Sequence, residues 1–551
     1  MSAGTFSRPE ALARLEEGHF DVCVIGGGIT GVGAALDAAS RGLRVALVER
    51  GDFAEGTSSR SSKLVHGGLR YLRQGEVRLV AGALIERQRL RGNAPHLVKD
   101  LPFVIPLFGH GGKLRRGLTR AIGGALWAYD LCGGALIGKL HRRLSKEQVL
   151  AAFPTLKPDQ VVGGYQYYDC QTDDARLVLS VIRTAALEYD AVAANRVSAT
   201  KVVRDSHGRV SAVLAQTADG ERLEISCRAV INATGVWAAD LGDIGIRPAK
   251  GVHLAFHRSL LGIDRGSILP SPVRGRSIFV IPLGEACYVG TTDTDYSGSL
   301  DDPRCNADDA AELLGALRSA TSLEVSEADV IGAWAGLRPL VAGTASARTA
   351  DLSRRHHVAE ADGVVTVTGG KLTTYRQMAA DAVDVVVGLL SGGDHRRRRS
   401  KTKRLRLRGA ASPQEVQDGL ESKGLPAAVA RHLAERYGTE ADELADLAAD
   451  EPNLGLPLTE GLPYLRAEVV WAARAEMART VDDVLSRRTQ ARHRHLAASM
   501  AIAEEAAALL GRELGWSPAE QQAEAAAYRE LAAADLAGIS SADPTKQPLN
   551  T

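Results

Sequence analysis

Three glycines near the N-terminus have the spacing of a loop that binds the phosphates of a dinucleotide. Gly26, Gly28 and Gly31 form a G-x-G-x-x-G pattern that encloses Ile29 and Thr30. In such a loop the first glycine permits a tight turn, the second lets a pyrophosphate approach the backbone, and the third lets a helix pack against a strand. The free N–H groups at the start of that helix would face the phosphates. The spacing therefore predicts a pyrophosphate site.

The elements around this loop are those that the motif requires. Residues 20–25 predict a buried strand, residues 29–41 are rich in alanine and predict a helix, and residues 43–48 predict a second strand. Glu49 follows the second strand, where its carboxylate could accept both hydroxyls of a ribose, and an acidic residue there disfavours a 2′-phosphate. This context favours a dinucleotide site over the alternative of a glycine-rich turn without a ligand.

Two later segments bear on which dinucleotide is bound. Residues 233–235 follow a short apolar run at 230–232, and residues 369–370 follow another at 364–367. Each segment alone is equally well explained as an ordinary strand and turn. Together they indicate strands that return to the first loop from distant parts of the chain, as a discontinuous domain around a long cofactor needs. Because an NAD domain would be more compact, these segments favour FAD.

The composition is that of a multidomain globular protein. Its 551 residues are too many for one ordinary domain, 45% are hydrophobic, and the formal net charge of +1 gives no reason to expect nucleic-acid binding. The six cysteines include no C-x-x-C pair and no metal-ligand spacing, so we expect no metal and a reducing, cytoplasmic compartment. Because no signal peptide and no uncharged apolar run of about 18 residues is present, any membrane contact is expected to be peripheral.

Several longer motifs resemble those of the FAD-dependent glycerol-3-phosphate dehydrogenases. The run from Thr57 to Leu72, TSSRSSKLVHGGLRYL, is similar to that family's signature, and so is GKLTTYR from Gly370 to Arg376. The resemblance extends in order from about residue 20 to past residue 490. The other matching segments are residues 168–177, 290–293, 336–340 and 479–489.

The resemblance and the composition together predict a fold of class α/β plus all-α. We expect a discontinuous, Rossmann-like FAD-binding domain interleaved with a substrate-binding domain on an antiparallel sheet, over residues 19–400. A change to Ala-, Leu- and Glu-rich sequence after a basic run predicts a C-terminal helical domain over residues 401–540. Residues 1–18 are predicted to be a flexible leader, and residues 541–551 a tail.

The resemblance also implies that residues 57–69 wrap the flavin. Short serine hydroxyls in this loop could bind phosphate or ribose, and its two adjacent glycines permit close approach of the backbone to the isoalloxazine ring. The predicted cofactor-binding residues are Gly26, Gly28, Ile29, Thr30, Gly31, Glu49, Thr57, Ser58, Ser59, Ser62, Lys63, Leu64, His66, Gly67, Gly68, Leu69, Val197, Ala233, Thr234, Gly235, Trp237, Gly370, Lys371, Leu372 and Thr373.

The substrate that the resemblance implies is sn-glycerol 3-phosphate. It would be oxidised to dihydroxyacetone phosphate by hydride transfer from C2 to flavin N5, with the flavin supplying the redox chemistry. A phosphate dianion needs cations, and Arg70, Arg338 and Lys371 each lie in a motif that resembles the family's. Arg354 resembles a further family arginine. Its role stays open, because Arg355 stands where the family usually has an acidic residue.

One histidine matches a family histidine near the substrate. The neutral imidazole of His253 could accept the proton of the C2 hydroxyl, although a structural histidine in the core is an equally good interpretation. Lys371 or Arg338 could instead stabilise a developing alkoxide. The predicted catalytic residues are His253, Arg338 and Lys371, and the predicted substrate-binding residues are these three with Arg70, Tyr71 and Arg354.

The electron acceptor is less well defined by the sequence. Relatives of this kind commonly reduce membrane quinone, which we expect here, and an oxygen-using oxidase is the alternative. Leu114, Leu118, Ile122, Leu126 and Tyr129 form an apolar stripe flanked by basic residues, as in helices that lie on anionic membranes. A helix packed against its own protein explains the stripe equally well. The expected partners are glycerol 3-phosphate, a membrane quinone and the cytoplasmic membrane surface, with no nucleic acid and with a homodimer left open.

Overall fold

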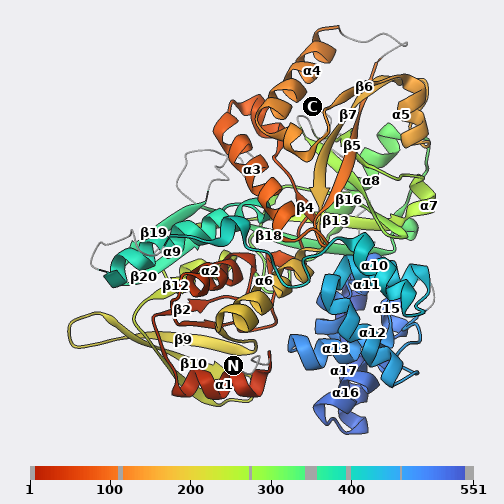
Figure 1. Cartoon of the computed structure of the whole chain (residues 1–551). Helices are drawn as coiled ribbons and strands as arrows, with labels where there is room; N and C mark the ends of the chain where they lie inside the picture. The colour runs from red at the N-terminus through yellow and green to blue at the C-terminus, as the bar shows by residue number, and fades with distance from the viewer. Residues whose placement is uncertain are drawn as a thin grey trace.

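The described part of the chain comprises three sheets and a separate group of helices. In Figure 1 the N-terminal elements lie beside β19 and β20, which are far away in the sequence, while the C-terminal helices form a body of their own. None of the described helices is long and apolar enough to cross a bilayer. This computed structural model describes residues 6–109, 116–242, 244–271, 273, 276–341, 356–391, 399–459 and 462–539.

A six-stranded sheet carries the glycine loop at its centre. Five of its strands are parallel, and only the edge strand β19 is antiparallel to its neighbour. Ile25 pairs with Asn232, and Asn232 pairs with Thr366, so three distant segments end at the same edge of the sheet. The strands in spatial order are β19 (His357–Ala361), β20 (Val364–Thr368), β12 (Val230–Asn232), β2 (Val22–Ile25), β3 (Val45–Val48) and β8 (Val192–Ala194).

Helix α2 (Ile29–Ser40) begins directly after the glycine loop and packs between α6 (Asp174–Tyr189) and α9 (Tyr375–Ser391). All residues of α2 from Gly31 onward are buried. A continuous apolar strand such as β2 is typical of a sheet covered on both faces. The strand–helix–strand unit and the discontinuous, Rossmann-like domain predicted from the sequence are therefore confirmed.

A small sheet, antiparallel except for the parallel pair β1 and β11, lies with the N-terminal helix beside this domain. The sheet consists of β1 (His19–Phe20), β11 (Arg222–Cys227), β10 (Val210–Thr217) and β9 (Val197–Arg204).

Residues 6–17 are folded, so the prediction of a flexible leader over residues 1–18 is wrong for them. The helix α1 (Arg8–Glu17) buries Ala11 and Leu15, which lie four residues apart on one face. The mainly polar composition concealed this narrow apolar face.

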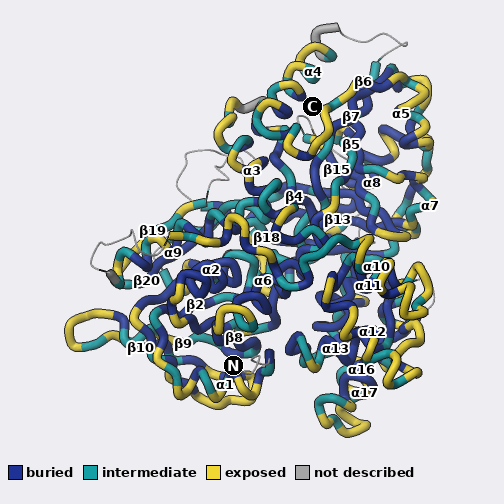
Figure 2. Tube along the Cα trace, viewed as in Figure 1, coloured by how far each residue is buried: buried dark blue, intermediate teal, exposed yellow. Residues whose placement is uncertain are grey.

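The substrate-domain sheet has ten strands, nearly all antiparallel, as predicted. One strand, β4, belongs to the loop that was predicted to wrap the flavin, so this loop joins the two domains. Figure 2 shows that the strands of both large sheets are mostly buried. The strands are β17 (Thr294–Asp295), β13 (Ile246–His257), β16 (Ala286–Gly290), β15 (Ser277–Leu283), β14 (Gly266–Pro270), β5 (Lys99–Phe108), β7 (Val161–Gln171) and β4 (Leu64–Val65), with β18 (Gly332–Val341) on β13 and β6 (Arg142–Leu144) on β7.

The described helices that flank the substrate-domain sheet include a short one, α7 (Arg258–Leu261), beside β13 and β16. The longer ones are α3 (Val77–Asn93), α4 (Arg116–Leu131), α5 (Lys146–Ala152) and α8 (Ala307–Ala320).

The prediction that the apolar stripe of residues 114–129 faces a membrane is wrong for the described side chains. Leu126 and Tyr129 in α4 are buried, and Ile122 packs on the same apolar cluster. The alternative, a helix packed on its own protein, is the one observed. Leu114 and the side chain of Leu118 lie outside the described residues.

The C-terminal helices enclose a core of their own. Its buried residues run from Leu420 to Ala532, whereas Leu405 and Leu407 still pack in the core of the FAD-binding domain. The helices are α10 (Pro413–Ser422), α11 (Ala427–Tyr437), α12 (Ala441–Asp450), α13 (Arg466–Glu476), α14 (Ala491–Arg494), α15 (Leu496–Ala501), α16 (Ala503–Leu514) and α17 (Pro518–Ala537). The predicted tail, residues 541–551, lies outside the described residues.

Candidate active site

The glycine loop has the shape that a pyrophosphate needs. Gly26 has a φ of +112°, and a Cβ there would lie 2.6 Å from the carbonyl oxygen of Ala233. At Gly28 the space beside the backbone is open, because a Cβ there would have only Ser58 Oγ within 4 Å. The N–H of Ile29, at the start of α2, donates to the same Ser58 Oγ at 2.9 Å. Backbone donors and open space at a helix N-terminus fit the phosphates of FAD.

The turn after β12 closes this edge of the sheet. Ala233 follows the strand and touches the glycine loop, Thr234 precedes Gly235, and a Cβ at Gly235 would meet no atom within 4 Å. Trp237 in the following η4 (Gly235–Asp240) lies with its ring 4.3 Å from the Arg50 guanidinium carbon.

Glu49 lies at the end of β3 with both carboxylate oxygens directed to backbone donors. It accepts the N–H of Gly27 at 2.6 Å and that of Gly51 at 2.8 Å. Burial raises the pKa of Glu49 to about 7. Its backbone carbonyl accepts the N–H of Val197 at 2.8 Å, which places this predicted residue beside it. Each carboxylate oxygen keeps acceptor capacity for a ribose hydroxyl.

The loop of residues 57–69, hereafter the flavin loop, is held in place by one buried aspartate, Asp174. The Lys63 ammonium, fully buried, donates to Asp174 at 2.8 Å and to the carbonyl of Ser59 at 3.0 Å. Ser61 Oγ also donates to Asp174, at 2.7 Å. Lys63 therefore stabilises the loop by a buried ion pair, and its charge is not directed at a phosphate site.

The second half of the flavin loop is docked on two other segments. The N–H of His66 donates to Thr373 Oγ1 at 2.9 Å, which ties the loop to η7 (Leu372–Thr374) after β20. The N–H of Gly67 lies 3.1 Å from Tyr129 Oη and 3.3 Å from Asp169. A Cβ at Gly67 would lie 2.5 Å from a Leu84 methyl carbon and 2.7 Å from Tyr129 Oη, so a larger residue would displace these side chains.

The paired strands β13 and β18 present a shared face to the flavin loop. In their register Trp334, Gly336 and Arg338 are opposite His253, Gly251 and Ala249, and the two-residue period puts all six on one face. A Cβ at Gly336 would lie 2.5 Å from the carbonyl oxygen of Arg60, and a Cβ at Gly251 equally close to Arg338 Nη2. The glycines thus make room for the loop and for the guanidinium.

Arg338 is held in place while part of its guanidinium stays accessible. It donates to Thr291 Oγ1 at 3.1 Å, to Asp293 at 3.2 Å and to the carbonyl of Thr292 at 3.3 Å. Its side chain is 22% exposed, so a small anion could reach it. A positioned arginine of this kind suits phosphate recognition.

His253 is buried next to this arginine. Its Nε2 is hydrogen-bonded to Ser62 Oγ at 2.9 Å, and its ring stacks on Trp334 with centroids 4.9 Å apart. Burial, with the charges of Arg338 and Lys63, lowers the pKa of His253 well below its ordinary value. The imidazole is therefore neutral near pH 7, and only 3% of the residue is exposed.

The remaining described cations of the prediction lie beside Tyr71 and the second half of the flavin loop. Lys371 Nζ lies 4.0 Å from the centre of the Tyr71 ring, and the Arg70 guanidinium carbon lies 5.5 Å from the same centre. A Cβ at Gly68 would lie 3.1 Å from Lys371 Nζ. Arg354 lies outside the described residues. The described cations therefore form two groups, Arg338 and the pair Arg70 and Lys371, joined by the flavin loop.

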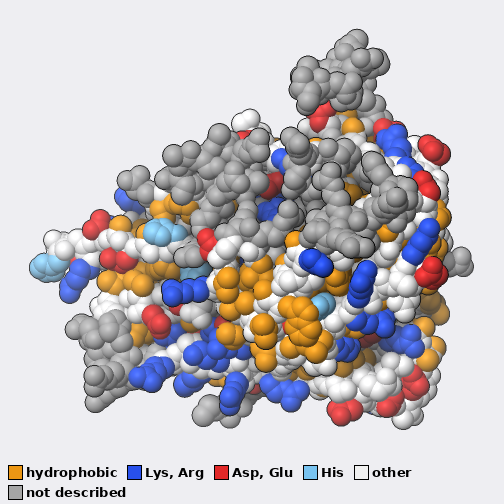
Figure 3. All heavy atoms as spheres, turned by 90° about the horizontal axis from the view of Figure 1, so that it is seen from above, with side chains coloured by type: hydrophobic (Ala, Val, Ile, Leu, Met, Phe, Trp, Pro, Cys, Tyr) orange, Lys and Arg blue, Asp and Glu red, His pale blue; other side chains and the backbone are white. Residues whose placement is uncertain are grey.

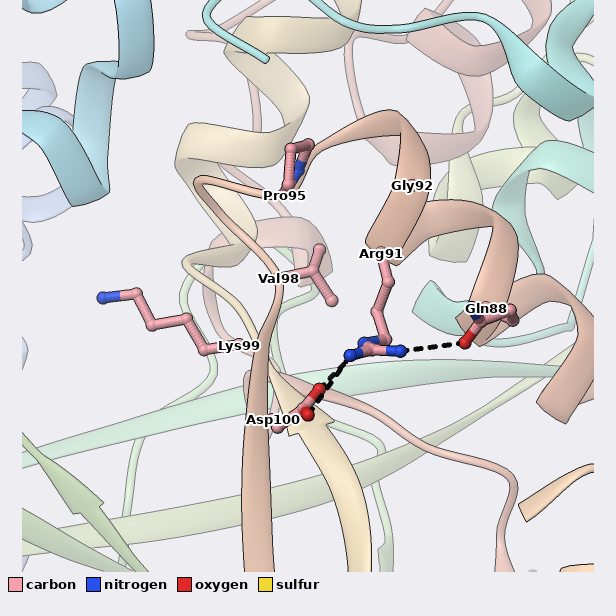
Figure 4. Close-up of a pocket in the computed structure, with 7 residues that line it drawn as sticks. All are labelled: Gln88, Arg91, Gly92, Pro95, Val98, Lys99 and Asp100. Carbon is pink, nitrogen blue, oxygen red and sulfur yellow. Dashed lines mark hydrogen bonds and ion pairs between the residues drawn. The ribbon is translucent and has the colours of Figure 1, made fainter. Parts of the chain in front are cut away.

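A cavity of about 450 Å³ lies away from these residues. Figure 4 shows Arg91 there, directed at Asp100, to which it is paired at 2.8 Å, and bonded to Gln88 at 3.0 Å. None of the predicted site residues lines it. The lining residues are Gln88, Arg91, Gly92, Pro95, Val98, Lys99 and Asp100.

Sequence reasoning missed the residues that support the site from behind. Asp174 and Asp169 occur in matched motifs but were given no role, and Tyr129 was assigned to a membrane-facing stripe. Trp334 could have been found from its two-residue spacing to Gly336, which places both on one strand face. The other supports come from distant segments, so no local pattern marks them.

The comparisons with known proteins agree with this geometry. The family model "FAD dependent oxidoreductase" matches residues 21–376, and the model "C-terminal domain of alpha-glycerophosphate oxidase" matches residues 400–521. A Mycobacterium tuberculosis protein named glycerol-3-phosphate dehydrogenase 2 is 39% identical, over 98% of this chain and 92% of its own. The mitochondrial glycerol-3-phosphate dehydrogenase of Rattus norvegicus is 38% identical, over 94% of this chain and 74% of its own.

A solved structure covers nearly the whole chain. The crystal structure of the glycerol-3-phosphate dehydrogenase from Bacillus halodurans complexed with FAD superposes with a TM-score of 0.79 and 28% identity. It covers 97% of this chain and 99% of its own. This similarity extends over all three domains.

Proposed function

We propose, since this chain belongs to the family of FAD-dependent glycerol-3-phosphate dehydrogenases, that it oxidises sn-glycerol 3-phosphate to dihydroxyacetone phosphate. The observation that carries the proposal is the shared face of β13 and β18. There a held, partly accessible arginine lies beside a neutral histidine, directly against the flavin loop. A phosphate group and a hydroxyl to be oxidised need this combination of groups.

FAD is the cofactor, and the residues at the sheet edge fit it. The glycine loop would hold the pyrophosphate, Glu49 the ribose hydroxyls, and the flavin loop the isoalloxazine ring. When bound, FAD supplies the oxidising chemistry by accepting the two electrons that leave C2 of the substrate. The chain binds the substrate, orients it and removes its hydroxyl proton.

In this proposal the phosphate lies between the two groups of cations. Arg338 is already oriented by Thr291 and Asp293, so little side-chain entropy is lost on binding. Arg70 and Lys371, near the second half of the flavin loop, would supply the other cationic contacts of the phosphate. Binding a dianion beside Arg338 would offset one of the charges that lower the pKa of His253.

The hydroxyl proton would leave through Ser62. Because His253 is nearly inaccessible and its Nε2 already contacts Ser62 Oγ, we place the serine hydroxyl between substrate and imidazole. The C2 hydroxyl donates its proton to Ser62 Oγ as Ser62 donates its own to His253 Nε2. The higher pKa of His253 in the substrate complex would favour this transfer.

Anaerobic titration tests the function. Glycerol 3-phosphate should bleach the flavin absorbance of the purified holoprotein, while glycerol and the sn-1-phosphate enantiomer should not. If glycerol 3-phosphate leaves the flavin oxidised at saturating concentration, the proposed substrate is wrong.

For the acceptor we propose a quinone, reached by contact with the membrane surface. The support is an exposed apolar group near α4: Trp127 is 55% exposed, Leu131 84%, Leu136 50% and Leu140 54%. The exposed Lys139, Arg142 and Arg143 lie close by in sequence. On the face seen from above, hydrophobic side chains gather with Lys and Arg around them (Figure 3). Apolar groups with basic neighbours fit an anionic bilayer.

Vesicle flotation tests this contact. The double substitution Trp127→Ser and Leu131→Ser should abolish binding to vesicles of anionic phospholipid, whereas Leu456→Ser, at a 48% exposed leucine of the helical domain, should not. Equal flotation of both variants would reject the surface. Reduction of a soluble quinone analogue without stoichiometric peroxide would support quinone, and the reverse would support the oxidase alternative.

A further inference from the structure

A seven-residue segment of the helical domain, Arg487–His493, lies behind the FAD and substrate site. It spans the end of η11 (Asp483–Arg488) and most of α14. We infer that this segment sets the positions of the glycine loop, the flavin loop and His253, so that the helical domain is needed for FAD binding and turnover. The turnover part rests on the proposed function, while the FAD part does not.

The first contact supports the glycine loop. Asp52 is completely buried and accepts Arg487 Nε and Arg488 Nη1, both at 2.6 Å. Although burial alone would raise it, the pKa of Asp52 is held well below the aspartate range by the two guanidiniums. Two residues later, the N–H of Ala54 donates to the carbonyl of Gly27 at 3.1 Å. The arginine pair thus fixes the loop on which the glycine turn rests.

The second contact supports the flavin loop. Gln490 Nε2 donates to Asp174 at 3.0 Å and to Asp173 at 2.8 Å. Asp174 is the aspartate that holds Ser61 and Lys63. One glutamine amide therefore orients the carboxylate that shapes this half of the flavin loop.

The third contact supports the imidazole. The His493 ring contacts Trp334 in a tilted arrangement with centroids 5.0 Å apart, and Trp334 in turn stacks on His253. His493 is buried, and its carbonyl oxygen would lie 3.0 Å from a Cβ at Gly332. Because the three rings contact one another in series, moving His493 would shift His253 relative to Ser62.

These residues are positioning residues, since each acts through a neighbour. Buried charges that lose a partner are strongly destabilising, so the aspartates tie the helical domain to the site in one arrangement. These interactions account for the contacts that η11 and α14 of the helical domain make with α6 and β18. Asp174 lies in α6, and Trp334 lies in β18.

The experiment compares FAD affinity with overall stability in full-length variants. Gln490→Met keeps the side-chain volume but removes the donor to Asp174, and it should weaken FAD binding about tenfold. Tyr528→Phe is the control, because it removes a buried hydrogen bond, to Ser499 at 2.9 Å, within the helical core alone. The control should lose thermal stability without losing FAD affinity.

A second pair of variants tests the ring stack. His493→Ala should lower kcat at full FAD occupancy with little change in KM, whereas His493→Phe, which keeps a ring on Trp334, should restore kcat. The inference is overturned if Gln490→Met binds FAD as the wild type does, or if FAD affinity falls equally in Tyr528→Phe. For turnover, it is overturned if His493→Phe is no better than His493→Ala. FAD affinity is measured without substrate. The comparison of Gln490→Met with Tyr528→Phe therefore stays valid even if the proposed substrate is wrong.

Discussion

Replacing Gly31 by alanine should weaken FAD binding more than it weakens the fold. Gly31 lies in the first turn of α2, and a Cβ there would lie 1.9 Å from the carbonyl oxygen of Gly26. Since such contacts are not seen below 3.0 Å, the turn at Gly26 must move by about 1 Å. That turn is the part of the chain that faces the pyrophosphate.

Two opposing effects set the magnitude. Alanine is better than glycine in a helix by about 1 kcal/mol, whereas forcing a methyl group into a packed contact costs about 1–3 kcal/mol. The fold is therefore destabilised by at most about 2 kcal/mol. Because the displaced turn is the part that faces the pyrophosphate, we expect the free energy of FAD binding to weaken by a similar amount. A loss of about 1–3 kcal/mol corresponds to a roughly 5- to 150-fold weaker affinity.

The assay is fluorescence titration of apoprotein with FAD, together with thermal unfolding of the apoprotein. Gly82→Ala is the control, because a Cβ at Gly82 in α3 would meet no atom within 4 Å. It should leave FAD affinity unchanged and stabilise slightly. If Gly31→Ala binds FAD as tightly as Gly82→Ala, the argument that this glycine shapes the phosphate turn is refuted.

Three further predictions concern charge. Arg338→Ala should raise the KM for glycerol 3-phosphate about 10- to 150-fold at unchanged FAD content, from the loss of charge-assisted hydrogen bonds; steady-state kinetics with unchanged KM would exclude Arg338 from the phosphate site. FAD affinity of the apoprotein should fall as the pH drops through about 7, where Glu49 gains a proton, and Glu49→Gln should remove this dependence in the same titration. The free energy of unfolding should fall as the pH drops below about 6.5. The reason is that His253 and His493 are held neutral in the fold and gain protons only on unfolding. A melting temperature that is constant from about pH 7 to about pH 5.5 would contradict this.

The cofactor half of the site was predictable because its information is local. The spacing of Gly26, Gly28 and Gly31 predicts a turn. The short apolar strands that end at residues 232 and 368 were expected to return to the same edge of the sheet. The convergence of these three segments is what the structure shows. The substrate half came from the family resemblance, and the structure places Arg338 and His253 on one face of the paired strands β18 and β13.

Other features depend on which surfaces meet, and the sequence does not contain that information locally. The partner of Asp52 lies 435 residues away at Arg487, so no pattern around Asp52 marks it. Periodicity in α4 correctly identified an apolar face but not what covers it, and the exposed large apolar residues among the described side chains of that helix are Trp127 and Leu131. The N-terminal helix was missed because its apolar face is narrow.

The order of the strands in the six-stranded sheet has a consequence for synthesis. β2 is complete when residue 25 has been made, but its neighbour β12 ends at residue 232, and β20 ends at residue 368. At roughly 5–20 residues per second, the nascent chain therefore keeps an apolar strand with an open edge for roughly twenty seconds to a minute. We therefore expect the flavin to be loaded late, after β20 has been made. A chain that ends before Arg487 has every phosphate-binding glycine but lacks the two arginines that pair with Asp52.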